Sequence, residues 1–207
     1  PAQTAGAYVI ADEVMTGFGR TGALFACEQL SVQPDMMCLS KGLTGGTLPL
    51  AVTLCRADVY DAFYSDDVHH AFYHGHSYTA NPLACAAALA SFDILLTEQS
   101  NQSRQRITQA HLDFAQHIMS HPRVDNVRTC GTILALTVKT MDGNHYLSSE
   151  RDQIYHYFLD RGILLRPMGN VLYLIPPYCI TDEQLQLIYQ TILNFLSADS
   201  RADLAIV

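Results

Sequence analysis

A short apolar run that ends in a lysine and a glycine-rich turn does most to restrict how this chain can fold. Met36–Leu39 form the run, and Ser-Lys-Gly-Leu-Thr-Gly-Gly-Thr follows at residues 40–47. An apolar run of this length between turn residues predicts a buried strand. Lys41 is then expected at the end of a strand, where α/β proteins bind ligands. Partial burial there is expected to lower the pKa of its amine and make it a nucleophile. The alternative is a surface lysine before a turn.

A second apolar run ends in a carboxylate. Residues 8–14 read Tyr-Val-Ile-Ala-Asp-Glu-Val, and a loop with three glycines follows at residues 15–22. A strand ending in Asp12, a glycine-rich loop and a strand ending in Lys41 suit a pyridoxal phosphate site: the lysine binds the cofactor covalently and the aspartate pairs with its ring nitrogen. Glu13 is expected to support a hydrogen-bond network. Arg20 fits an ion pair and a pocket equally well.

These residues resemble the signature of the class III pyridoxal phosphate aminotransferases, through residues 12–22, Asp35 and residues 40–47. More narrowly, residues 24–28, 41–47, 81–87, 166–167 and 172–178 are similar to the branch of that family that makes diaminopelargonic acid in biotin synthesis. Met15 favours this branch, because many other members carry a glutamine at that position. Members of the family are longer, so the chain is expected to be the C-terminal half of such an enzyme.

The resemblance implies a fold class and a domain division. It implies an α/β chain with the fold-type I architecture of pyridoxal phosphate transferases. Residues 1–100 are expected to form the C-terminal part of the large, mixed-sheet cofactor domain. Residues 101–207 are expected to form the small C-terminal α+β domain.

The resemblance also assigns roles to individual residues. It implies that Lys41 is catalytic, that Asp12, Val14, Lys41 and Ser77 bind pyridoxal 5'-phosphate, and that Gly75, Arg166 and Tyr173 bind substrate. Ser77 replaces a threonine and keeps its hydroxyl, whereas His76 replaces a proline, which predicts a less rigid loop. A structural arginine at the domain interface is the alternative for Arg166, and a core tyrosine is the alternative for Tyr173.

The implied reaction is the transamination of 8-amino-7-oxononanoate to 7,8-diaminononanoate, with S-adenosylmethionine as the amino donor. The implied enzyme is a cytoplasmic homodimer whose sites are shared between subunits and which acts on small molecules. Two alternatives stay open. One is another class III ω-aminotransferase, and the other is an inactive fragment that serves only as a structural or dimerisation unit.

Composition restricts the possible partners. The formal net charge of −8 disfavours nucleic acid and anionic membranes. No apolar run is long enough to span a membrane, and no signal peptide pattern is present. Six scattered cysteines are interpreted as small core residues in a reducing compartment. The histidines at 69, 70, 74 and 76 match no zinc pattern, so no metal is expected.

Further elements follow from periodicity and from start and stop signals. In the first domain we expect short helices at 25–30 and 56–64, a strand at 49–55, a surface loop at 65–72, and a helix from Asn81-Pro82 to Leu96. The domain boundary is expected at 98–105, followed by a helix at 107–120 and two strands broken at Gly131 within 124–139. A turn at 141–144, a helix at 148–160 capped by Gly162, a β-hairpin over 163–175, and a last helix opened by a capping box at Thr181 and Gln184 complete the chain.

Overall fold

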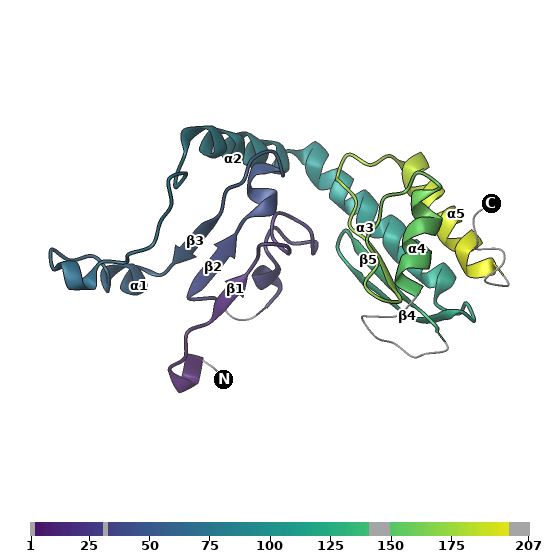
Figure 1. Cartoon of the computed structure of the whole chain (residues 1–207), viewed down its shortest axis with the longest axis horizontal. Coiled ribbons are helices and arrows are strands. Elements are labelled where there is room, and N and C mark those ends of the chain that lie inside the picture. The colour runs from purple at the N-terminus through teal and green to yellow at the C-terminus, as the bar shows by residue number, and fades with distance from the viewer. Residues whose placement is uncertain (1–2, 31–32, 141–149, 199–207) are drawn as a thin grey trace. The chain divides into compact units, whose positions relative to one another are not determined.

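The structure is a computed structural model that describes residues 3–30, 33–140 and 150–198 (Figure 1). It divides into two compact units, Pro1–Asn101 and Gln102–Val207. The division falls inside one helix, α3 (Glu98–Ile118). This division lies within the boundary expected at 98–105. The helix expected at 107–120 begins earlier, at Glu98, because the Glu, Gln and Arg residues of this polar stretch favour helix and need no burial.

The first unit contains a three-stranded mixed sheet in the order β1-β2-β3. Its strands are β1 (Ile10–Asp12), β2 (Met36–Leu39) and β3 (Val52–Cys55). Strands β1 and β2 are parallel, with Asp12 opposite Cys38. Strands β2 and β3 are antiparallel, with Leu39 opposite Val52. The mixed sheet agrees with the α/β expectation.

The strands of this sheet are less buried than their apolar sequences predicted. Ile10 is 58% exposed and Leu54 is 53% exposed, and all four residues of β3 are exposed. The prediction of a buried strand was therefore wrong for β1 and only partly correct for β2, in which Leu39 is buried and the other three residues are partly exposed. An apolar strand is buried only where another layer covers it, and the described residues supply little cover for this sheet.

Helical segments connect and flank these strands. They are η1 (Gln3–Ala5), η2 (Ala26–Gln29), η3 (Lys41–Thr44), α1 (Ala57–Asp61), η4 (Val68–His70) and α2 (Pro82–Leu95). The start of α2 confirms the sequence signal, because the Asn81 side chain accepts a hydrogen bond from the Ala84 backbone N–H at 2.9 Å, with Pro82 in the first turn. Helix α2 packs against η3.

The second unit combines an antiparallel sheet with helices. The sheet has the order β4-β5-β6, with β4 (Val124–Cys130), β5 (Ile133–Val138) and β6 (Val171–Leu174). The helices are the C-terminal part of α3, α4 (Glu150–Leu159) and α5 (Asp182–Ser197). The capping box at Thr181 and Gln184 is confirmed. The turn expected at 141–144 lies outside the described residues.

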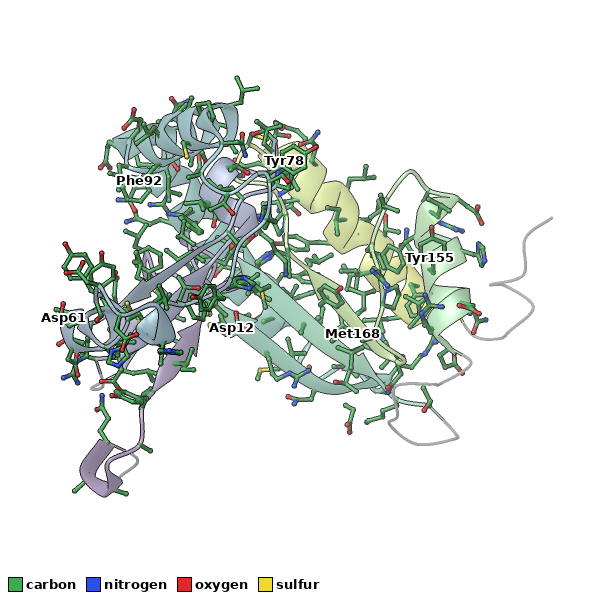
Figure 2. The ribbon with its side chains drawn as sticks, turned by 60° about the vertical axis from the view of Figure 1, so that its left-hand side comes forward. Asp12, Asp61, Tyr78, Phe92, Tyr155 and Met168 are labelled. Carbon is green, nitrogen blue, oxygen red and sulfur yellow. The ribbon has the colours of Figure 1, made fainter. Side chains whose placement is uncertain are left out.

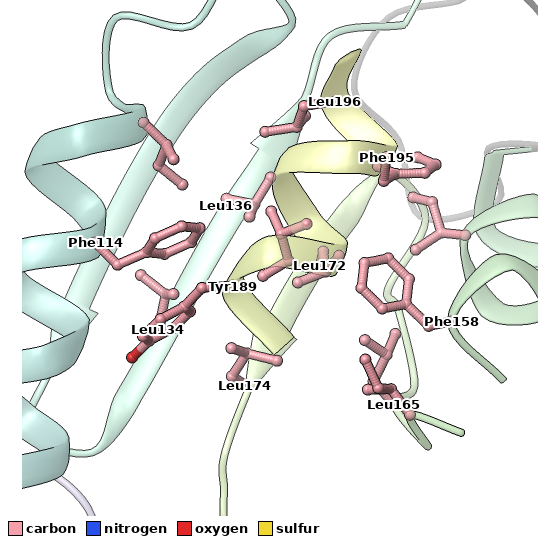
Figure 3. Packing of buried hydrophobic residues seen from close by; sticks show 14 of the residues in the cluster. Phe114, Leu134, Leu136, Phe158, Leu165, Leu172, Leu174, Tyr189, Phe195 and Leu196 are labelled. Atoms are coloured by element: carbon pink, nitrogen blue, oxygen red, sulfur yellow. The ribbon is translucent and has the colours of Figure 1, made fainter. Parts of the chain in front are cut away.

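The core of the second unit lies between this sheet and its helices (Figure 3). Alternate residues of β5 and β6 face the helices, among them Leu134, Leu136 and Leu172, each with no exposed surface. Helix α3 contributes Phe114 at the spacing of one helical face, and Phe114 stacks on Tyr189 of α5 with ring centroids 4.2 Å apart. This core forms within residues 102–198 alone.

The expected hairpin over 163–175 was wrong. Strand β6 pairs with β5, and only one bridge, between Met168 and Val171, joins it to the preceding segment. The described residues show no further bridge between these two segments. Residues 163–167 run instead as a single segment in which Ile163 and Leu165 are buried.

The cysteines also differ from expectation. Cys55, Cys130 and Cys179 are exposed and the other three are partly exposed, so none is a fully buried core residue. All six are free thiols. Within the described ranges, no helix has the length and apolar character needed to cross a membrane.

Candidate active site

Two neighbouring parallel strands place Asp12 and Lys41 at one edge of the first unit's sheet. Asp12 is the last residue of β1 and pairs with Cys38 in β2, and the Glu13 N–H donates to the Cys38 carbonyl at 3.0 Å. Lys41 begins η3, two residues after β2 ends. Figure 2 labels Asp12 at the end of its strand. The carboxyl edge of a parallel pair is where α/β proteins bind ligands.

The side chains of Asp12 and Lys41 are both exposed. One carboxylate oxygen of Asp12 accepts a hydrogen bond from the Val14 backbone N–H at 3.1 Å, which fixes the start of the loop. The expected partial burial of Lys41 was wrong for this chain, because nothing in the described residues covers its side chain sufficiently to bury it. An exposed carboxylate and an exposed amine at one edge can both reach a ligand there.

Lys41 has an unusual backbone. Its φ is +44°, in the left-handed region that side chains other than glycine rarely adopt. The turn is closed by the Gly46 N–H, which donates to the Lys41 carbonyl at 3.2 Å, and by the Leu43 N–H, which donates to Ser40 at 3.0 Å. Such strain persists only where the surroundings hold it, and it is concentrated at functional sites.

Glu13 organises the glycine-rich loop from inside. It is 2% exposed, and its carboxylate accepts hydrogen bonds from the Thr16 hydroxyl, from the Ala26 N–H at 3.0 Å and from the Cys27 N–H at 2.7 Å. Burial raises the pKa of this carboxyl, but the hydrogen bonds outweigh burial and leave the pKa below its ordinary value. The expected structural role of Glu13 is confirmed.

The loop that carries Gly75 and Ser77 is exposed and locally ordered. The His76 N–H donates to the Thr79 hydroxyl at 3.1 Å, and the Tyr78 N–H donates to His76 Nδ1 at 3.1 Å. These bonds close a turn around Ser77, next to His76, which replaces the proline of the resembling family. The Ser77 side chain is exposed and open to a ligand or to another chain.

Arg166 and Tyr173 belong to the second unit. Arg166 is exposed and precedes the buried Pro167. Tyr173 is partly exposed and lies opposite Ala135 in the β5–β6 pair. Asp12, Val14, Lys41, Gly75 and Ser77 all belong to the first unit.

A cavity of about 540 Å³ opens elsewhere in the first unit, at the opposite end of β2. Its lining includes Asp35 and Arg56 and contains neither Asp12 nor Lys41. Asp35 accepts hydrogen bonds from the Val9 N–H at 2.8 Å and from Arg56 at 2.7 Å, and these hold the pKa of its carboxyl below the ordinary value. Asp35 therefore links the segments next to β1 and β3, at the end of the sheet away from Lys41. The described residues contain no group of three side chains able to hold a metal ion.

Two residues that contact Gly42, next to Lys41, were not predicted from the sequence. Phe18 is 6% exposed and packs against Gly42, and Ser91 of α2 donates to the Gly42 carbonyl at 3.4 Å. The only local signal for Phe18 was its place between two glycines. Ser91 stands in an alanine-rich helix and gave no signal, because its partner is 49 residues away in sequence.

Comparison with known proteins adds a family. A model of the family described as aminotransferase class III matches residues 2–196. The adenosylmethionine-8-amino-7-oxononanoate aminotransferase of Synechococcus elongatus is 51% identical over 194 residues, which are 94% of this chain and 45% of that protein. The enzyme of the same name from Helicobacter pylori is 39% identical, over 86% of this chain and 41% of that protein.

Solved structures agree. The adenosylmethionine-8-amino-7-oxononanoate aminotransferase from Methanocaldococcus jannaschii has a TM-score of 0.82 and 33% identity, over 93% of this chain and 47% of that chain. An omega transaminase from Pseudomonas jessenii in complex with PMP has a TM-score of 0.84 and 28% identity, over 95% of this chain and 45% of that chain. The chain thus spans less than half the length of these relatives.

Proposed function

The chain belongs to the class III aminotransferase family, and from that premise we propose that the protein carrying it makes 7,8-diaminononanoate in biotin synthesis. The amino group comes from S-adenosylmethionine and the acceptor is 8-amino-7-oxononanoate. The observation that carries the proposal is the identity to the Synechococcus elongatus enzyme, which extends over nearly the whole chain. The fold is that of the fold-type I pyridoxal phosphate aminotransferases.

The cofactor of this family is pyridoxal 5'-phosphate. The donor groups at the Lys41 edge fit it: an exposed amine to bind its aldehyde carbon and an exposed carboxylate to pair with its ring nitrogen. When bound, the cofactor supplies an electron sink that lets a hydrogen leave the carbon next to the donor's amino group as a proton. No metal ligand set competes for this edge among the described residues.

Each residue at the edge then has a defined task. The Asp12 carboxylate keeps a proton on the ring nitrogen by charge. Lys41 Nζ would take the proton from the donor carbon as a general base and, as a general acid, would deliver it to the cofactor carbon that carried the aldehyde. Val14 would pack against the ring. The Ser77 hydroxyl, from a separate loop, would donate a hydrogen bond to a phosphate oxygen of the other subunit's cofactor.

Substrate binding is assigned to Gly75, Arg166 and Tyr173. The Arg166 guanidinium is exposed and can bind the carboxylate of the oxo acid through two parallel hydrogen bonds. Tyr173 is partly exposed and can line the same pocket. Gly75 is assigned to substrate binding by the family resemblance; a Cβ built there would meet only Thr79 Oγ1, at 3.9 Å.

The proposed assembly is a homodimer in the cytoplasm. The loop around Ser77 is exposed, which suits a contact made to the other subunit's cofactor. The first unit also exposes large apolar residues, among them Leu54, Phe72 and Tyr73. Apolar surface on this scale marks an interaction site. The small-molecule substrates require neither nucleic acid nor membrane.

A second class III activity stays in consideration because an omega transaminase matches the backbone equally well. Backbone likeness therefore does not separate the two activities. The higher sequence identity to the biotin-pathway enzymes favours the first.

The test uses the protein that carries this chain, loaded with pyridoxal phosphate, and measures 7,8-diaminononanoate by mass spectrometry. S-adenosylmethionine is expected to support product formation, and Lys41→Ala is expected to abolish it. Product formed only with another amine would favour the ω-aminotransferase alternative. Absence of product with every donor would contradict the proposed reaction.

A further inference from the structure

The left-handed backbone of Lys41 costs free energy that its surroundings must offset. Two hydrogen bonds close the turn, and the one from the Leu43 N–H to the Ser40 carbonyl spans the Lys41 N–Cα bond, so the turn itself supplies part of this support. The residue that follows, Gly42, does not adopt a positive φ. The backbone conformation at position 42 would therefore accept a side chain, and a side chain there is excluded by neighbouring atoms instead.

Phe18 is that neighbour. A Cβ built on Gly42 would lie 2.7 Å from Phe18 Cδ2 and 3.0 Å from its Cβ and Cγ, and these are the three nearest atoms. Real Cβ atoms do not approach so closely, so the phenylalanine side chain fills the space beside Gly42. Ser91 of α2 also donates to the Gly42 carbonyl, at 3.4 Å. Gly42 is thus contacted both by the Phe18 ring and by a side chain of α2.

Phe18 is itself held firmly. Its φ is +63°, it is 6% exposed, and its ring meets that of Phe25 edge-on at 5.7 Å. The loop around it is fixed by the Gly19 N–H, which donates to the Leu24 carbonyl at 3.0 Å, and by the Glu13 carboxylate. Phe18 and Lys41 thus both have a positive φ, and Phe18 contacts the residue that directly follows Lys41.

We propose that Phe18 is a positioning residue that holds Lys41 in its left-handed turn through contact with Gly42, and so aims the lysine amine at the cofactor. The proposal rests on the proposed function of Lys41. Phe18 does not touch the reacting atoms in this account. Loss of the contact lets the Lys41 backbone relax and turns its amine away, and a small misplacement of a reacting group costs a large factor in rate.

The chain contains two lysines, Lys41 and Lys139. Lys139 is exposed and belongs to the second unit, so it serves as an internal reference. The experiment incubates the protein that carries this chain with pyridoxal phosphate, reduces it with borohydride, and measures the ratio of label on the two lysines by peptide mapping. The same ratio in concentrated urea gives the value for an unfolded chain.

Phe18→Ala and Gly42→Ala are each expected to lower the Lys41 to Lys139 ratio about tenfold. Phe18→Leu combined with Gly42→Ala is expected to restore it to within about threefold of wild type, because the shorter side chain leaves room for the new methyl group. Phe63→Ala, an exposed phenylalanine of the same unit, is the matched control and is expected to leave the ratio unchanged.

The pH profile of Lys41 labelling is recorded for each variant with its melting temperature. A displaced amine is expected to change the pH profile of labelling, whereas a general loss of stability leaves the profile of the folded fraction unchanged. Wild-type ratios and profiles in Phe18→Ala and Gly42→Ala would overturn the proposal, as would additive losses in the double variant. A wild type without label on Lys41 would instead overturn the proposed function.

Discussion

The Glu13 carboxylate and the Cys27 backbone N–H are joined by a 2.7 Å hydrogen bond across fourteen positions of sequence. The same carboxylate accepts from Thr16 and Ala26, so one buried side chain ties the start of the glycine-rich loop to its end. Because Asp12 directly precedes Glu13 and Phe18 lies within the loop, this tie also fixes the surroundings of both residues.

Replacing Glu13 with glutamine is expected to destabilise the chain by about 2 kcal/mol, the usual effect of losing charged hydrogen bonds at a buried group. Urea unfolding measures this, with exposed Glu28→Gln as the matched control. The pKa of Glu13 is lower in the folded chain than its ordinary 4.5. Its contribution is therefore complete above pH 4.5 and is lost as pH falls through the folded pKa. Equal stability of the two variants would contradict this role.

Asp12→Asn is expected to slow the transamination on the order of 10²-fold, since an amide carries no charge to keep the ring nitrogen protonated. The rate of amino transfer in the protein that carries this chain is the measurement. Asp61→Asn changes an exposed aspartate in the same unit and is expected to leave the rate unchanged. An Asp12→Asn rate within threefold of wild type would contradict the assignment.

A buried histidine makes the second unit sensitive to acid. His111 has no exposed surface, its Nδ1 lies 2.6 Å from the Tyr189 hydroxyl, and burial lowers its pKa from 6.5 to about 4. The unfolded chain therefore binds a proton first as pH falls. The contribution that neutral His111 makes to the free energy of unfolding is complete above pH 6.5. It is lost as the pH falls from 6.5 to about 4, by about 3 kcal/mol in total.

Unfolding free energies at pH 7 and pH 5 test this. His111→Gln is expected to remove about 2 kcal/mol of the difference between the two pH values. His117→Gln, at an exposed position of the same helix, is expected to retain the difference. A His111→Gln variant with the wild-type pH dependence would show that another group titrates.

Arg123 closes the C-terminal end of α5. Its Nη1 donates to the carbonyls of Phe195 and Ala198, each at 2.8 Å, and its guanidinium lies 5.3 Å from the Phe195 ring centroid. Arg123→Ala is expected to cost about 2–3 kcal/mol in urea unfolding, because the last carbonyls of the helix lose their donor. Arg151→Ala, at an exposed pair with Asp152, is expected to cost less than about 0.5 kcal/mol. Similar losses in both variants would contradict the capping role.

Local signals in the sequence predicted most of the helices and strands and the placement of Asp12 and Lys41 at strand ends. The Asn81 cap, the Thr181 capping box and the break at Gly131 depend on neighbouring residues, and all three are confirmed. The carboxyl edge that carries Asp12 and Lys41 followed from two apolar runs that end in polar residues.

Contacts between distant segments were not predictable in this way. The packing of Phe18 on Gly42 joins two loops through shape, and shape leaves no local pattern. The hairpin predicted before β6 was wrong, because β6 pairs along its length with β5, and an apolar pattern does not specify which segment a strand pairs with. The prediction of buried strands in the first sheet was not fulfilled, because an apolar sequence does not show whether another layer of the structure covers the strand.

The most direct test of the account is the identity of the lysine that binds pyridoxal phosphate. The protein that carries this chain is incubated with the cofactor, reduced with borohydride, and digested for mass spectrometry. The account predicts label on Lys41, a visible absorbance that accompanies it, and loss of both in Lys41→Ala with any weak label on Lys139 unchanged. Label on Lys139 alone, or specific label that survives Lys41→Ala, would contradict the role of Lys41 at the carboxyl edge of β2.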